Sequence, residues 1–145
     1  MLSNESGEVL KPQDAKILIV EDETIVSLDM QAIVEGMGIA VTGIARSVDE
    51  ALSCIAAEPP DLVLLDISLA GEFEGVELAR TIDSRWGIPV VFISGHLGHQ
   101  AVKGLDELNT LGYIVKPFYP VNLRETLEAA ISALPLPPRA ERRKA

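Results

Sequence analysis

The sequence has little cysteine and no long apolar run, and each shortage excludes a class of protein. A single cysteine, Cys54, cannot form a disulfide within the chain. No apolar run approaches the roughly 20 residues that a membrane-spanning helix needs, and residues 1–14 lack the basic start and apolar centre of a signal peptide. We therefore expect a cytoplasmic protein that makes no membrane contact.

Basic residues are also scarce. The 12 lysines and arginines are outnumbered by 22 acidic residues, for a formal net charge of −10. A direct nucleic-acid binder needs a basic face, so this balance argues against one. The exception is the proline-rich segment 135–145, which carries Arg139, Arg142, Arg143 and Lys144. We expect a solvated basic tail there, and a weak contact with an acidic partner is the alternative.

Length and composition indicate one domain. The 145 residues are 48% hydrophobic and show no internal repeat, which is typical of one globular core. We expect a flexible amino-terminal arm over residues 1–14, one domain over 15–134, and the tail over 135–145.

Five short apolar segments alternate with helix-forming segments. The expected strands are 16–20, 39–45, 61–66, 88–94 and 113–116, and the expected helices are about 24–37, 47–57, 75–86, 100–108 and 120–134. This alternation predicts right-handed crossovers and an α/β fold, a doubly wound (βα)5 domain with a parallel sheet. We expect the flavodoxin-like strand order 2-1-3-4-5, in which the first and third strands are neighbours.

Two helices carry more specific signals. The first is expected to pack through a stripe of Ile25, Leu28, Ile33 and Met37. The second is expected to begin with a capping box, formed by Ser47 and by the glutamate three residues later.

Polar residues follow the expected strands where a doubly wound sheet places its ligand crevice. Glu21 and Asp22 follow the first strand, Asp66 ends the third, Ser94 ends the fourth and Lys116 ends the fifth. Taken singly, such residues more often end a strand, cap a turn or stay solvated. Their arrival at one edge of one sheet favours a functional site.

These residues together suit phosphoryl transfer. Three neighbouring carboxylates, Glu21, Asp22 and Asp66, would repel one another unless a cation lay among them, and hard oxygen ligands suit Mg²⁺. Asp66 would be the nucleophile that forms an aspartyl phosphate. Mg²⁺ and the Lys116 ammonium would neutralise the phosphoryl oxygens, and the Ser94 hydroxyl would bind one of them.

Four motifs carry a family resemblance. Lys-Ile-Leu-Ile-Val-Glu-Asp-Glu, Leu-Val-Leu-Leu-Asp, Val-Phe-Ile-Ser-Gly and Tyr-Ile-Val-Lys-Pro-Phe, in this order, resemble the receiver domain of two-component response regulators. The resemblance spans about residues 16–134. It implies that Asp66 accepts a phosphoryl group from a sensor histidine kinase or a histidine phosphotransfer protein. It also implies that Asp22 and Asp66 bind Mg²⁺ directly, that Glu21 acts largely through water, and that the Ser68 backbone carbonyl completes the ligands.

The resemblance further implies a switch. Ser94 would move toward the phosphoryl group, and Tyr113 would swing inward and remodel the surface used for output. The alternative for Tyr113 is a half-buried strand aromatic without a switching role. The family also suggests a cis peptide bond between Lys116 and Pro117.

Three features depart from the family pattern. Ala70 replaces a common proline and Gly75 comes about one residue late, which puts the loop after Asp66 in doubt. Gly95 replaces a common alanine, and Asn109-Thr110 replaces a common Gly-Ala.

The sequence also leads to an expected mode of action and to two alternative functions. Too few residues follow residue 134 for an output domain, so we expect a stand-alone regulator, or else the receiver of a longer protein, that acts through a protein partner as a monomer or a phosphorylation-dependent dimer. It is expected not to be a turnover enzyme. One alternative is a receiver-like binding module that needs no phosphorylation. Another is a haloacid dehalogenase-type phosphatase, which needs a second acid where this chain has Ser68.

Overall fold

The computed structural model describes residues 11–69, 74–95 and 110–134. Its elements are β1 (Lys16–Val20), α1 (Thr24–Gly36), β2 (Ala40–Ala45), α2 (Val48–Ala57), β3 (Leu62–Asp66), α3 (Glu74–Trp86), β4 (Val90–Ser94), β5 (Thr110–Val115) and α5 (Pro120–Ala133), with a short 3-10 helix at Pro12–Asp14. The helix expected at 100–108 lies outside the described residues, as do Ala70, Asn109, residues 1–10 of the expected arm and the basic tail.

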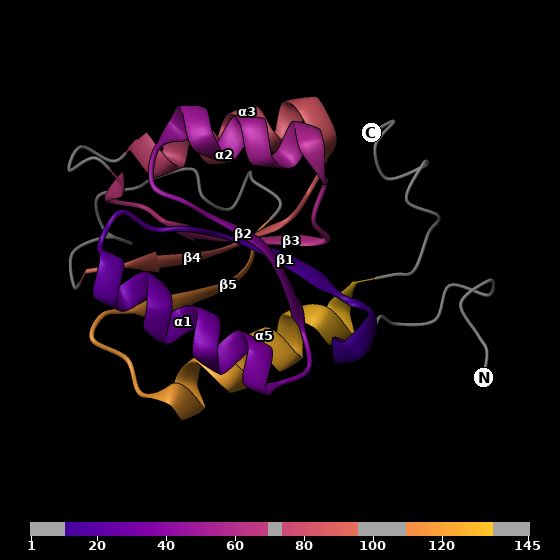
Figure 1. Ribbon diagram of the computed structural model, residues 1–145, viewed down its shortest axis with the longest axis vertical. Helices are drawn as coiled ribbons and strands as arrows, with labels where there is room; N and C mark the ends of the chain where they lie inside the picture. Colours follow the sequence, from indigo (N-terminus) through magenta and orange to yellow (C-terminus); the bar gives the residue numbers. More distant parts are fainter. Residues whose placement is uncertain (1–10, 70–73, 96–109, 135–145) are drawn as a thin grey trace.

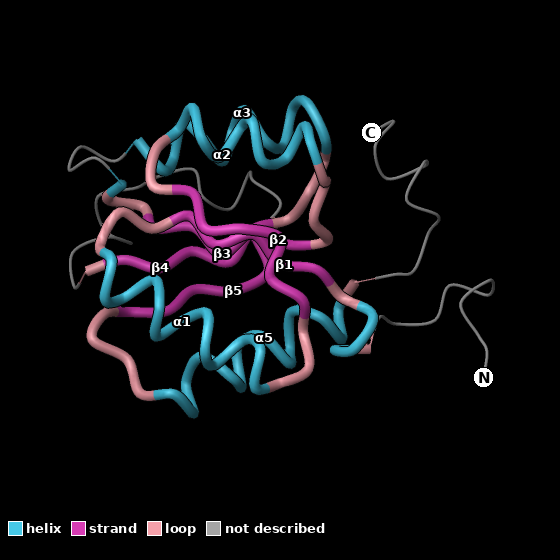
Figure 2. The backbone as a smooth tube through the Cα atoms, viewed as in Figure 1, coloured by secondary structure: helices cyan, strands magenta, loops and turns pink. Residues whose placement is uncertain are grey.

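The strands form one parallel sheet in the order β2-β1-β3-β4-β5, which confirms the predicted topology. Helices α2 and α3 cover one face of the sheet, and α1 and α5 cover the other (Figure 1). Figure 2 shows the sheet as a central layer between these helical layers. Every residue of β3 is buried because neighbours on both edges and helices on both faces enclose it.

The core has two halves, one on each face of the sheet. Alternate residues of β1 and β3 point to opposite faces, so each strand contributes to both halves. The half beneath α1 and α5 includes Ile17, Ile19, Leu62 and Leu64. The half beneath α2 and α3 includes Leu18, Val20, Val63 and Leu65. This burial holds both strands, and therefore the residues that follow them, in one arrangement.

The predicted packing stripe of α1 is wrong in its first half. Ile25 is 81% exposed and Leu28 is 55% exposed, although Ile33 and Met37 pack partly against the core. The buried positions of α1 are instead Ser27, Met30 and Val34. Burial of the serine is tolerated because its hydroxyl donates a 2.8 Å hydrogen bond to a carbonyl of the first helical turn. Two large apolar side chains are therefore left on the surface.

The fourth and fifth strands differ from their expected bounds. β4 begins at Val90 rather than at residue 88, since Pro89 has no N–H to donate to a sheet. β5 begins at Thr110, three residues earlier than expected. It contains Gly112, where a Cβ atom would lie 2.7 Å from the Thr126 side chain of α5. The close approach of α5 therefore accounts for a glycine within this strand.

The capping box of α2 is half formed. The Ser47 hydroxyl accepts a hydrogen bond from the Glu50 backbone N–H at 3.1 Å, as expected. The Glu50 carboxylate, however, accepts from the backbone N–H of Arg46 at 2.8 Å rather than from that of Ser47.

Within the described ranges, no helix is both long enough and apolar enough to cross a membrane.

Candidate functional site

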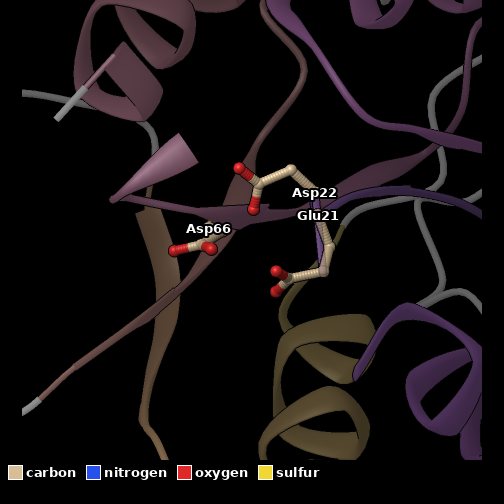
Figure 3. A group of neighbouring side chains, drawn as sticks. All are labelled: Glu21, Asp22 and Asp66. Carbon is tan, nitrogen blue, oxygen red and sulfur yellow. The ribbon is translucent and has the colours of Figure 1, made fainter. Parts of the chain in front are cut away.

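Three carboxylates meet at the carboxyl ends of β1 and β3. Glu21 and Asp22 directly follow β1, and Asp66 ends β3, its neighbour in the sheet. One oxygen atom from each carboxylate lies within 4.8 Å of the other two. Figure 3 shows the three side chains directed toward a common space. Glu21 and Asp66 are buried and Asp22 is half-buried.

Lys116 joins this cluster from the loop after β5. Its Nζ lies 3.1 Å from Glu21 Oε1, 3.0 Å from Glu23 Oε1 and 3.2 Å from Asp66 Oδ2. Its backbone N–H donates to the Ser94 carbonyl at 2.7 Å, which ties the loop to the end of β4. The Lys116–Pro117 peptide bond is cis, as the resemblance suggested.

The buried charges shift two pKa values. Burial is the main reason that the pKa of Glu21 is raised to about 7, and the charge of Asp66 adds to it. Hydrogen bonding from the Glu23 backbone N–H, together with Lys116, acts in the opposite direction. For Lys116, burial alone would lower the pKa, but the carboxylates of Glu23, Asp66 and Glu21 outweigh it and raise the pKa above its usual value.

The donor set suits a small divalent cation. Glu21, Asp22 and Asp66 offer carboxylate oxygens, and Glu21 Oε1 is buried with no aligned hydrogen-bond donor among the described residues. Three carboxylates and one ammonium leave an excess of negative charge, which a divalent cation would offset. Mg²⁺ prefers such oxygen ligands and retains several waters, so the residues present fit this ion.

Ser68 contacts Asp66 through its amide. Its backbone N–H donates to Asp66 Oδ1 at 2.9 Å, while its side chain is exposed. This hydrogen bond fixes the orientation of the Asp66 carboxylate. The expected role of the Ser68 carbonyl as a metal ligand stays a prediction.

Ser94 and Tyr113 form a pair beside the carboxylates. The two hydroxyl oxygens lie 2.6 Å apart, and the Ser94 hydroxyl also donates to the Gly95 carbonyl at 3.0 Å. A hydroxyl has one hydrogen, so the Tyr113 hydroxyl is the donor to Ser94. Ser94 is fully buried, and the half-buried Tyr113 packs against the core beneath α2 and α3. The tyrosine therefore points inward in this structure.

Three residues near the site are not among the predicted site residues, and Gly75 was considered only for the length of the loop after Asp66. Glu23 binds Lys116, and Arg46 donates from Nη2 to the Asp22 carbonyl at 3.0 Å. At Gly75 a Cβ atom would lie 2.2 Å from the Asp66 carbonyl oxygen. Two positions in the sequence could have indicated these contacts. Glu23 directly follows Glu21 and Asp22, and Arg46 directly follows β2. The close approach at Gly75 had no such signal, because it depends on how α3 meets β3.

The fold and the site define the class of protein. A doubly wound sheet with a buried strand-end aspartate, neighbouring acids and a lysine is the arrangement of a receiver domain. Residues 17–128 match the family model described as the response regulator receiver domain. The chain belongs to this family.

Similar proteins include response regulators of several kinds. The chain is 35% identical to the phyllosphere-induced regulator PhyR of Methylorubrum extorquens over 90% of its own length and 49% of that protein. The crystal structure of PhyR from Brucella abortus matches with a TM-score of 0.71 and 31% identity, covering 86% of this chain and 49% of that one. The receiver domain of NtrX from Brucella abortus matches with a TM-score of 0.74 and 30% identity, covering 81% and 98%. The chain thus spans about half the length of PhyR and nearly all of the NtrX receiver.

Proposed function

We propose that this protein is a phosphoacceptor that takes a phosphoryl group on Asp66 in a Mg²⁺-dependent reaction. The observation that carries the proposal is the position of Lys116, whose Nζ lies 3.2 Å from Asp66 Oδ2 within a cluster of three acids. A lysine in that position pairs with the carboxylate before transfer and with phosphoryl oxygens afterwards. Family membership supports the same role.

The reaction is a displacement at phosphorus. A carboxylate oxygen of Asp66 attacks the phosphorus of a phosphohistidine, and the P–N bond breaks with its electron pair remaining on the imidazole. Lys116 would stabilise the charge on the transferred group, and Ser94 would bind one of its oxygens. The residues that would hold Mg²⁺ are Glu21, Asp22, Asp66 and the Ser68 carbonyl. The ion, when bound, supplies further positive charge to the phosphoryl oxygens.

A surface beside the site supports a protein donor, which would be a sensor histidine kinase or a histidine phosphotransfer protein. Ile25 and Leu28 are exposed on α1. A groove of about 370 Å³ lies between this helix and the loop after β5 and is lined by Ile25, Val26, Asp29, Lys116, Pro117 and Phe118. Exposed apolar residues that border a buried acceptor suit transient protein docking.

The signal would leave this protein as a conformational change that a second protein recognises. Ser94 and Tyr113 link the site to β5, and movement of this pair on phosphorylation would alter the surface of β5 and α5. One similar structure is that of a double mutant of the anti-anti-sigma factor PhyR from Bartonella quintana. Because the present chain spans only part of such proteins, we propose no more for its own output than contact with a protein partner.

The decisive experiment is intact-mass measurement after incubation with Mg²⁺ and acetyl phosphate. We expect the wild type to gain one phosphoryl group, about 80 Da, and Asp66→Asn to gain none. Circular dichroism of Asp66→Asn checks that the fold survives. Failure of the wild type to accept a phosphoryl group from both acetyl phosphate and a phosphohistidine protein would leave the phosphorylation-independent binding module. Sustained hydrolysis of phosphate esters would indicate the phosphatase instead.

A further inference from the structure

Lys116 also contacts Glu23, a carboxylate that the proposed reaction does not require. Its Nζ lies 3.0 Å from Glu23 Oε1, as close as it lies to Glu21 and Asp66. The three acids differ in exposure. The side chain of Glu23 is 63% exposed, whereas those of Glu21 and Asp66 are 0% and 4% exposed. Glu23 therefore binds Lys116 from the solvent side of the site.

The backbone holds Glu23 in place. It is the residue that precedes α1, with the extended φ of −88° and ψ of 115° typical of a helix cap. Its N–H donates to Glu21 Oε2 at 3.1 Å, and its carbonyl accepts from the Ser27 N–H at 2.9 Å. Within the described part of the chain, its side chain makes no capping hydrogen bond and instead contacts Lys116.

A phosphoryl group on Asp66 would draw the Lys116 ammonium toward its oxygens and away from one of these carboxylates. Lys116 Nζ donates hydrogen bonds to Glu23 Oε1 and Asp66 Oδ2, and Glu21 Oε1 lies 3.1 Å from it without an aligned N–H. Release of Glu21 would leave a buried carboxylate with less compensation, and Asp66 is itself the acceptor. Release of Glu23 costs least, because water can solvate its exposed carboxylate.

We propose that Glu23 is a positioning residue that restrains Lys116 in the unphosphorylated protein and is exchanged for a phosphoryl oxygen when Asp66 is modified. The proposal rests on the proposed phosphoacceptor function. Glu23 competes with the incoming group for the Lys116 ammonium, so its presence slows phosphorylation and weakens retention of the phosphoryl group. Glu23 thereby sets how fast Asp66 is phosphorylated and how long it retains the phosphoryl group, without contacting the reacting atoms.

The test compares initial rates of phosphorylation by acetyl phosphate at saturating Mg²⁺. We expect Glu23→Gln to react about twofold to fivefold faster than the wild type, the range for loss of one exposed ion pair. Glu23→Asp retains the charge but shortens the side chain, so it should behave like Glu23→Gln. Because the ion pair is exposed, the difference should shrink at about 1 M salt, where the Debye length is only about 3 Å.

A control variant separates positioning by Glu23 from a general change of surface charge. Asp49→Asn removes one exposed acidic charge from the first turn of α2, which follows β2, and should leave the rate unchanged. Equal acceleration by Asp49→Asn, a wild-type rate for Glu23→Asp, or no effect of Glu23→Gln would overturn the proposal. A wild type that accepts no phosphoryl group would overturn the proposed function and this inference with it. A reactive wild type with an unchanged Glu23→Gln variant would overturn only the inference.

Discussion

The hydroxyl of Tyr113 lies 2.6 Å from that of Ser94, which joins the middle of β5 to the end of β4. Ser94 is fully buried, and its second hydrogen bond goes to the adjacent Gly95 carbonyl. Any movement of the Ser94 hydroxyl toward a phosphoryl group on Asp66 must therefore break or reshape its contact with Tyr113. In the proposed function, this pair would connect phosphorylation of Asp66 to the surface of β5.

Tyr113→Phe removes the donor of this hydrogen bond. We expect the free energy of unfolding to fall by about 1 kcal/mol, since Ser94 keeps its bond to the Gly95 carbonyl and is not left unpaired. Urea unfolding measures the change. The matched control is Tyr119→Phe, because Tyr119 is 75% exposed and its change should stay within about 0.5 kcal/mol. Equal effects of the two substitutions would contradict the role given to this hydrogen bond.

Ser94→Ala should separate phosphorylation from switching. The mass gain on Asp66 should persist at a reduced rate, because Lys116 and the carboxylates remain. The NMR chemical shifts of the Tyr113 ring should then respond less to phosphorylation than in the wild type. A wild-type response of Tyr113 in this variant would mean that Ser94 does not couple the two events.

Stability should depend on pH through Glu21. Its pKa is raised from 4.5 to about 7, so between these values the folded protein holds a proton that the unfolded chain has released. The free energy of unfolding should therefore fall as the pH rises through this window, by at most about 3 kcal/mol. Thermal unfolding across this range tests the sign, and Glu21→Gln should flatten the dependence.

Added Mg²⁺ should counter this loss of stability. A cation binds ionised carboxylates, so proton binding by Glu21 competes with it. We expect Mg²⁺ to raise the melting temperature more at pH 8 than at pH 5, with Ca²⁺ and Na⁺ at matched ionic strength as comparisons. A Mg²⁺ effect of equal size at both pH values, or in Asp22→Asn as large as in the wild type, would argue against the three-carboxylate site.

Gly75 should not tolerate a side chain. A Cβ atom there would lie 2.2 Å from the Asp66 carbonyl oxygen and 2.8 Å from the Ile67 backbone, which cannot rotate away. We expect Gly75→Ala to destabilise the protein by about 1 to 3 kcal/mol and to slow phosphorylation of Asp66. Gly36→Ala is the control, because no atom lies within 4 Å and a helical alanine should stabilise by about 0.5 to 1 kcal/mol.

The exposed apolar residues of α1 should affect the rate of phosphorylation only when the phosphoryl donor is a protein. Ile25→Gln should change the free energy of unfolding by less than about 0.5 kcal/mol, because the side chain is 81% exposed. Transfer from a phosphorylated kinase or phosphotransfer protein should slow severalfold, while acetyl phosphate should react at the wild-type rate. Equal rates with the protein donor would place the docking surface elsewhere.

The sequence by itself determined the kind of sheet and the grouping of the main candidate site residues. Short β-branched strands between helical segments predict a doubly wound parallel sheet, and the carboxyl ends of its strands lie at one edge. Glu21, Asp22, Asp66 and Lys116 could therefore be grouped before any coordinates were known. Local pattern was sufficient because each of these residues directly follows or ends a strand.

Tertiary packing alone decided which face of α1 is buried and which further residues contact the site. Which face of α1 is buried depended on a serine that bonds to its own helix, so apolar periodicity selected Ile25 and Leu28 wrongly. The contact of Glu23 with Lys116 joins residues 93 positions apart, and the clash at Gly75 depends on how α3 approaches β3. Such contacts are set by the distances between packed elements, and a linear pattern of residue types does not contain those distances.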